Sequence, residues 1–423
     1  MSCIDKEKKK RHQLLVFMAI AALAFISGCA DPPDDVYIPD DDVPVVLDER
    51  HSVWRNLKIY SIFHYRLPDT IGSMTPYDMF DRISDTLRGA RYTEYMSDRP
   101  TGDTLFDPNT VFYDPEEVTP STVYFCLPEF SDTALVVFNR ILPILAEYQN
   151  IIIDVRDNGG GYLSVSDAIL GEMLPYGTPY VNVRYRDYNA RIDAGETLED
   201  VFSTETRRPK LLNKKIAVLI NGYSASASEI LAAGLKDRAG AYLVGGSNSY
   251  GKGMGQLLIP ITTPERVKKL SVTFLELSGL SERTGKYHRV GIWPDQVPAD
   301  VETDVNEHVP NVNQQEIIQA QIEDIQAEYP NVSAEYIRRI LVRELREIYY
   351  AMKMLQPDYA FPEDGEDGDS VVVGMAKRRS ADIGEIAAKI YRARERAKAR
   401  WRPIGAVIAD ENDLPGGKLF GGK

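Results

Sequence analysis

Short apolar runs alternate with longer amphipathic segments through the middle of this 423-residue chain. The run Ile151-Ile-Ile-Asp-Val155 lacks an apolar–polar alternation, which is typical of a strand buried on both faces of a parallel sheet. The expected elements are, in order, strand 123–127, helix 132–148, strand 151–155, helix 163–174, strand 215–221, helix 226–238 and strand 241–245, with β-rich segments at 256–261 and 270–277. This alternation predicts an α/β fold in which helices pack on the sheet.

The sequence on either side of this pattern predicts segments of different character. Residues 29–50 are rich in Pro and Asp and predict a solvated tether, whereas residues 51–119 have a mostly helical, aromatic pattern. The α/β core is expected over 120–301. A helical extension is expected over 302–423, with an acidic linker at 357–369.

The extension contains three expected helices. Two long helical patterns cover 314–328 and 333–355, and an Ala- and Arg-rich basic helix is centred on 383–401. The excess of bases in the last helix fits an anionic partner. It also fits a solvated face that complements the acidic body of the chain, which is the simpler interpretation. The sequence assigns no role to this extension.

The first 28 residues predict an export signal rather than folded structure. The segment Lys6–Arg11 is basic, and the apolar run Leu14–Ile26 is shorter than the roughly 20 residues of a membrane-spanning helix. This run ends in Ile26-Ser-Gly-Cys29, which resembles the lipobox of bacterial lipoprotein signal peptides. The resemblance implies cleavage before Cys29 and a lipid anchor on its thiol, in the cell envelope. A plain secretory signal with an incidental cysteine is the alternative.

Net charge and the small numbers of cysteine and histidine argue against several classes of function. A formal net charge of −14 argues against a nucleic-acid partner, because binding to phosphates needs an excess of basic residues. The chain has only 3 cysteines and 5 histidines, and their spacing matches no disulfide framework or metal site. We therefore expect no metal and no cofactor.

The most informative segment is Asn221-Gly-Tyr-Ser-Ala-Ser-Ala-Ser-Glu229, which follows one expected strand and opens the next helix. Small side chains at such a turn let a substrate backbone approach closely, and the first helical turn has unpaired amides. A serine there would have an oxyanion-stabilising amide beside it. The same residues also fit a capping box, Ser226-x-x-Glu229, which needs no catalysis.

A second segment places Lys252 between two glycines. The spacing Gly246-x-x-x-x-Gly251-Lys252 is close to that of a phosphate-binding loop, but Gly253 supplies no hydroxyl and the continuation is β-like where that motif needs a helix. The spacing Ser249-x-x-Lys252 is that of the penicillin-binding motif, but the intervening glycine disfavours the helical turn it requires. Both alternatives are set aside.

A third segment, Ile151–Gly161, ends the apolar strand in three consecutive glycines. It does not fit a calcium loop, because Arg156 and Val165 stand where ligands belong. Glycines at a strand end can offer backbone N–H groups to an anion. A structural tight turn is the alternative.

Together these segments resemble the C-terminal-processing, or tail-specific, serine proteases. The matches are D-L-R-x-N-x-G-G at Asp154–Gly161, S/T-A-S-A-S-E at Ser224–Glu229, G-K-G-x-x-Q at Gly251–Gln256 and G-I-x-P-D at Gly291–Asp295. Order and approximate spacing agree from Val123 to Pro298. The resemblance implies a serine endopeptidase on a ClpP/crotonase-like α/β core.

The resemblance also implies individual roles. They are nucleophile Ser226, general base Lys252, lysine-positioning residue Gln256, and oxyanion donors Ala227 with Gly160 or Gly161. A lysine is a base only when neutral, so burial must lower the pKa of Lys252 from its usual value of about 10.4. Neutral Lys252 could then take the proton of Ser226 as an acyl-enzyme forms, without a histidine.

Two departures from the family pattern limit these expectations. Only residues 51–119 lie between the tether and the core, so no PDZ module is expected and selectivity for C-terminal tails is not predicted. The loop 245–252 is expected to be one residue longer than the corresponding loop of the family. The expected partners are protein or peptide substrates and a membrane, reached through lipid on Cys29. An inactive peptide-binding scaffold of the same fold is the alternative function, and the oligomeric state is left open.

Overall fold

The computed structural model describes residues 49–83, 86–87, 90–96, 115–186, 197–262, 267–296, 312–328, 330–358 and 388. The predicted signal peptide, Cys29, the tether and most of the basic helix around 383–401 lie outside these residues. None of the described helices is long and apolar enough to cross a bilayer.

The chain forms two compact units that do not follow its linear order. Among the described residues, the first contains those up to position 99 together with those of 183–200 and 254–276, and the second contains those of 100–182, 201–253 and 277–423. The predicted core over 120–301 is therefore divided between the two units, while the C-terminal helices belong to the second. Pairing between strands that lie far apart in the sequence creates this division.

The second unit is built on a five-stranded sheet. Its strand order is β10-β9-β6-β5-β4, where the outer strands are β10 (Tyr242–Val244) and β4 (Glu116–Thr119). The central strands β5 (Thr122–Cys126), β6 (Asn150–Asp154) and β9 (Lys215–Leu219) pair in parallel, as does β10, whereas β4 is antiparallel to β5. Every residue of β5 and β6 is buried, as their apolar sequences predict.

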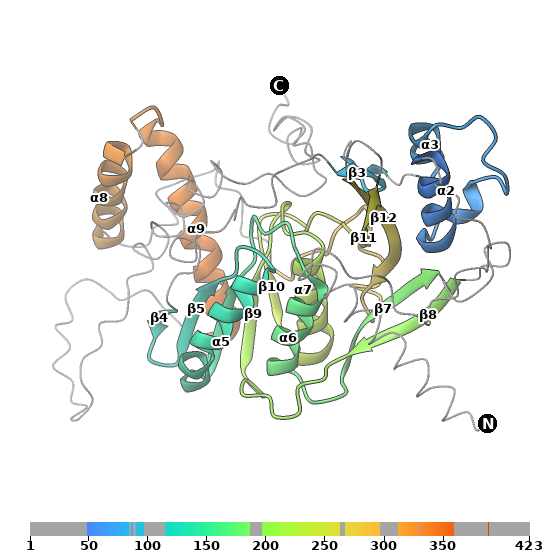
Figure 1. Cartoon of the computed structure of the whole chain (residues 1–423). Helices are drawn as coiled ribbons and strands as arrows, with labels where there is room; N and C mark the ends of the chain where they lie inside the picture. Colours follow the sequence, from blue (N-terminus) through green and yellow to red (C-terminus); the bar gives the residue numbers. More distant parts are fainter. Residues whose placement is uncertain are drawn as a thin grey trace. The chain divides into compact units, whose positions relative to one another are not determined.

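Helices cover both faces of this sheet (Figure 1). One layer contains α5 (Asp132–Glu147), α6 (Leu163–Met173) and α7 (Ala227–Ala239), which pack side by side. On the other face, α9 (Ala334–Leu355) packs against β6, β9 and β10, with α8 (Val312–Glu328) beside it. A core cluster joins Ile152 of β6 and Leu219 of β9 to Leu341 of α9. The C-terminal helices are thus an integral layer of the α/β fold.

The first unit holds α2 (Glu49–Tyr60), the 3-10 turn η1 (His64–Arg66), α3 (Pro76–Ile83) and most of a second sheet. That sheet has the order β11-β12-β7-β8, with β3 (Glu94–Met96) also paired to β12. Its other strands are β7 (Pro179–Arg186), β8 (Thr197–Ser203), β11 (Met254–Thr262) and β12 (Val267–Ser278). A separate small pair is formed by β1 (Thr86–Leu87) and β2 (Ala90–Arg91).

The structure confirms the predicted α/β fold class. It adds strands to the mostly helical prediction for 51–119, because β1, β2, β3 and β4 follow α3 among the described residues. The prediction also lacked β7 and β8. Segments such as β1 and β2 are only 2 residues long, which is too short for a detectable alternation of apolar and polar residues.

Candidate active site

Ser226 lies at the turn between β9 and α7. Its φ of 58° and ψ of −115° put a non-glycine residue in a strained conformation, directly before the first residue of the helix. A sharp strand-to-helix turn of this kind exposes a nucleophilic serine in other hydrolases. The N–H of Ala227 points out of the first helical turn, where no intrahelical acceptor exists.

The hydrogen bonds distinguish the three serines of this segment. The Ser224 hydroxyl donates to the Val155 carbonyl over 2.7 Å, and the Ser228 hydroxyl donates to the Asn158 carbonyl over 2.8 Å. Both side chains are fully buried, whereas Ser226 retains 7% exposure. The outer serines therefore tie the turn to the neighbouring strand end, and Ser226 is the most exposed of the three.

Glu229 is the centre of the polar contacts around this turn. It is fully buried, and its Oε2 accepts the Ser226 N–H over 2.9 Å and the Lys252 N–H over 2.8 Å. Its Oε1 accepts from the Ser249 hydroxyl over 2.5 Å and from the Gly251 N–H over 2.7 Å. Burial raises the pKa of Glu229, and these donors oppose that rise by stabilising the carboxylate. One carboxylate oxygen thus holds the backbones of Ser226 and Lys252 side by side.

Lys252 lies in a non-helical segment that leads directly into β11. This extended continuation agrees with the rejection of a phosphate-binding loop, in which a helix would follow. Burial lowers the pKa of Lys252 to about 8, although the Glu229 carboxylate acts in the opposite direction. A substantial fraction of Lys252 is therefore neutral in mildly alkaline solution, as a general base requires.

The glycine-rich loop packs directly against the serine turn. A Cβ added to Gly160, where φ is +98°, would lie 2.7 Å from the Ser226 Cβ, so only glycine fits there. The Gly160 N–H donates to Asn158 Oδ1 over 2.8 Å. Within the described part of the chain, the N–H groups of Gly161 and Ala227 have no such internal acceptor.

Asn158 connects this loop to its surroundings. Its side-chain amide donates to the Leu127 carbonyl over 2.6 Å, and its own carbonyl accepts from the Ala225 N–H over 2.9 Å. The side chain is fully buried. Asn158 therefore adds to the contacts that hold the strand end after β6 against the turn before α7.

The segment Gly291–Asp295 reaches the same region through Ser249. The Ile292 N–H donates to the Ser249 hydroxyl over 2.7 Å, and that hydroxyl donates onward to Glu229. Asp295 pairs with Lys236 of α7 at 2.6 Å. The four motifs matched in the sequence thus meet in one place, with the exception of the last three residues of the third motif, which end at Gln256 and lie in the first unit.

Gln256 lies on β11 in the first unit, where its amide donates to the Met254 carbonyl over 3.3 Å. Its proposed role toward Lys252 stays a prediction. Sequence reasoning missed Glu229 and Asn158 as organising residues. Glu229 had two signals in the sequence, the capping-box spacing and its place at the end of the S/T-A-S-A-S-E match, and neither of them indicates the bond to Lys252.

The described residues contain no group of three or more His, Cys, Asp or Glu side chains arranged to hold a metal ion. His64 is buried, and its Nδ1 lies 3.1 Å from the Ser61 carbonyl oxygen.

Residues 121–297 match the model of peptidase family S41. Among curated proteins, the carboxy-terminal processing protease CtpB of Bacillus subtilis is 32% identical over 188 residues, which are 44% of this chain and 36% of that protein. A carboxy-terminal-processing protease of Bartonella bacilliformis is 35% identical over 153 residues, 34% of this chain and 30% of that protein. The chain thus spans about a third of the length of these relatives.

Among solved structures, the photosystem II D1 C-terminal processing protease is similar at 22% identity and a TM-score of 0.33. The match covers 44% of this chain and 45% of that one.

Proposed function

We propose that this chain, whose residues 121–297 match the model of peptidase family S41, is a serine endopeptidase that cleaves proteins or peptides in the bacterial cell envelope. The observation that carries the proposal is the shared carboxylate of Glu229, which binds the N–H groups of both Ser226 and Lys252. A candidate nucleophile and a candidate base are thereby held on adjacent backbones. The envelope location rests on the predicted lipid anchor at Cys29.

The proposed reaction proceeds through an acyl-enzyme. Neutral Lys252 takes the hydroxyl proton of Ser226 as its Oγ attacks the substrate carbonyl carbon, and a tetrahedral oxyanion forms. The lysine then passes this proton to the leaving amine as the peptide C–N bond breaks. The lysine then takes a proton from water as the water oxygen attacks the ester carbonyl carbon, and it returns that proton to Ser226 Oγ as the acyl C–O bond breaks.

The hydrogen bonds favour one set of oxyanion donors. The Gly160 N–H already donates to Asn158 Oδ1. We therefore propose that the N–H groups of Ala227 and Gly161 donate to the oxyanion. The role of Gly160 is then to allow the close approach of its loop to Ser226. Gln256 is proposed, as before, to position the lysine.

Replacing the lysine tests the function directly. Lys252→Ala should abolish cleavage of unfolded casein by the purified chain, because no other group takes the serine proton, and the fragments can be followed by mass spectrometry. Lys286→Ala is the matched control, since Lys286 is an exposed lysine of the same unit. Cleavage by Lys252→Ala at the wild-type rate would contradict the mechanism. No cleavage by any of the three proteins would favour the inactive peptide-binding scaffold.

The pH profile provides an independent measurement. Only neutral Lys252 accepts a proton, so kcat/KM should rise with pH and reach half of its plateau near the pKa of about 8. Below this pH, kcat/KM should fall about tenfold per unit as the lysine becomes protonated. A peptide without titrating groups between pH 6 and 10 isolates the enzyme's own titration. A profile that is flat through pH 8 would contradict the assignment of Lys252 as the base.

A further inference from the structure

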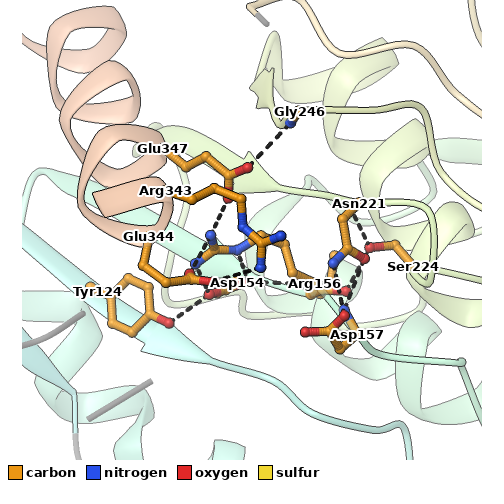
Figure 2. Close-up of polar contacts among 11 residues, drawn as sticks. Tyr124, Asp154, Arg156, Asp157, Asn221, Ser224, Gly246, Arg343, Glu344 and Glu347 are labelled. Atoms are coloured by element: carbon orange, nitrogen blue, oxygen red, sulfur yellow. Dashed lines mark hydrogen bonds and ion pairs between the residues drawn. The ribbon is translucent and has the colours of Figure 1, made fainter. Parts of the chain in front are cut away.

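Arg156 is the most deeply buried cation near the site, and its partners come from two distant parts of the chain. Its guanidinium pairs with Asp154 Oδ2 at 2.5 Å, with Glu344 Oε2 at 2.5 Å and with Glu347. All four side chains are at most 4% exposed. Figure 2 shows the two glutamates extending from one helix, α9, toward the arginine.

Glu347 also contacts a second active-site segment. While its Oε2 binds Arg156, its Oε1 accepts the Gly246 N–H over 3.2 Å (Figure 2). Gly246 follows β10 and begins the segment that ends at Lys252. The Glu347 carboxylate therefore connects Arg156, at the end of β6, with Gly246, which follows β10.

The strand end that carries Arg156 leads directly into residues 157–161, called here the oxyanion loop because they contain the proposed donor Gly161. The next residue, Asp157, exchanges two hydrogen bonds with Asn221, one from its N–H to Asn221 Oδ1 over 3.0 Å and one from Asn221 Nδ2 over 2.8 Å. The Asn221 N–H in turn donates to the Ser224 hydroxyl over 3.0 Å. A continuous set of contacts thus runs from α9 through Arg156 to the turn that presents Ser226.

The charges of this cluster are costly if its purpose is stability alone. Three carboxylates surround one guanidinium, and burying charges incurs a desolvation penalty that apolar side chains of similar volume avoid. Burial by itself would lower the pKa of Arg156, but Asp154, Glu344 and Glu347 raise it well above its ordinary value, so the guanidinium stays charged. Directional charged contacts hold loops at a defined position, which apolar packing does less strictly.

We propose that Glu344 and Glu347 of α9 are positioning residues of the active site, acting through Arg156 on the oxyanion loop and through Gly246 on the segment that carries Lys252. This inference rests on the proposed function and assigns the C-terminal helix a role in it. The helix then aligns the oxyanion donors and the base relative to Ser226, although it supplies no group that touches the substrate.

Three variants and one matched control test the proposal. Glu347→Ala removes both contacts of that carboxylate, and Glu347→Gln keeps an acceptor for only one of them. Glu344→Gln removes one negative charge facing Arg156. Glu335→Gln is the control, because it makes the same change at an exposed position of α9. Each protein is assayed for kcat and KM on a peptide taken from a casein cleavage site, and for amide hydrogen exchange.

A positioning role predicts a loss in kcat rather than in binding. We expect Glu347→Ala to lower kcat at least about tenfold at nearly unchanged KM, with Glu347→Gln between it and the wild type. Hydrogen exchange should accelerate in 157–161 and 245–252 and stay unchanged in α5. Glu335→Gln should match the wild type in both measurements. Wild-type kcat in Glu347→Gln and Glu344→Gln, or acceleration spread evenly over the unit, would overturn the proposal.

The exchange measurement separates this inference from the proposed function. If the wild type cleaves no peptide, the proposed function fails, while selective loosening of the two loops still supports the contacts of α9 as their anchor. If the wild type is active and neither loop loosens in any variant, the inference fails and the proposed function stands.

Discussion

Ser226→Ala should abolish peptide hydrolysis, with kcat at least about 10³-fold below the wild type, because the attacking oxygen is lost. The fold should remain, since the bond from the backbone N–H of residue 226 to Glu229 does not involve the side chain that is removed. We expect the free energy of unfolding to change by less than about 1 kcal/mol. Steady-state kinetics and urea unfolding of the same preparation measure both effects.

The neighbouring serines provide matched controls for this variant. Ser224→Ala and Ser228→Ala each remove one buried hydrogen bond to a backbone carbonyl, which should lower the free energy of unfolding by about 1 kcal/mol. Both should keep measurable turnover, because the hydroxyl of Ser226 is intact. If either variant is inactive while Ser226→Ala still turns over, the nucleophile has been assigned to the wrong serine.

Glu229→Gln should damage both stability and catalysis. The new NH₂ group cannot accept hydrogen bonds, so two of the four buried donors around residue 229 lose their acceptor, at about 1–3 kcal/mol each. Whichever way the amide turns, one carboxylate oxygen that holds the Ser226 turn or the 249–252 segment is lost, and we expect kcat/KM to fall by about 10²-fold. Urea unfolding and kinetics on a peptide substrate measure the two effects.

The control for Glu229→Gln is Glu172→Gln on α6. The Glu172 carboxylate accepts one exposed hydrogen bond, from the Lys210 N–H over 2.9 Å, so its replacement should change the free energy of unfolding by less than about 0.5 kcal/mol. Wild-type turnover and stability in Glu229→Gln would mean that this carboxylate does not align the site.

Much of the fold follows from local sequence patterns. The helices α5, α6, α7, α8 and α9 and the strands β5, β6, β9 and β10 lie within about two residues of their expected bounds, because apolar periodicity and caps act over one or two turns of chain. The Ser131 and Ser333 side chains cap α5 and α9, as their positions before the helical patterns suggest. The match of residues 121–297 to family S41 agrees with the family resemblance of the four motifs.

The short strands and the division into two units could not be predicted in this way. β1 and β2 are defined by each other's hydrogen bonds rather than by a pattern of their own, and the pairing of β11 with β12 shifts its register between Gly255 and Gln256. The unit boundaries depend on which distant segments pair. Such contacts depend on the whole fold and leave little trace in any one stretch of sequence.

The α/β class could be predicted from the alternation of strands and helices, and the candidate dyad of Ser226 and Lys252 from short motifs with their own chemistry. How these motifs meet depends on the packed fold. Glu229 reaches the Lys252 N–H across 23 positions, and Arg156 reaches Glu347 across 191. A buried carboxylate takes whichever donors the packed fold brings to it, so its role depends on partners that no local pattern specifies.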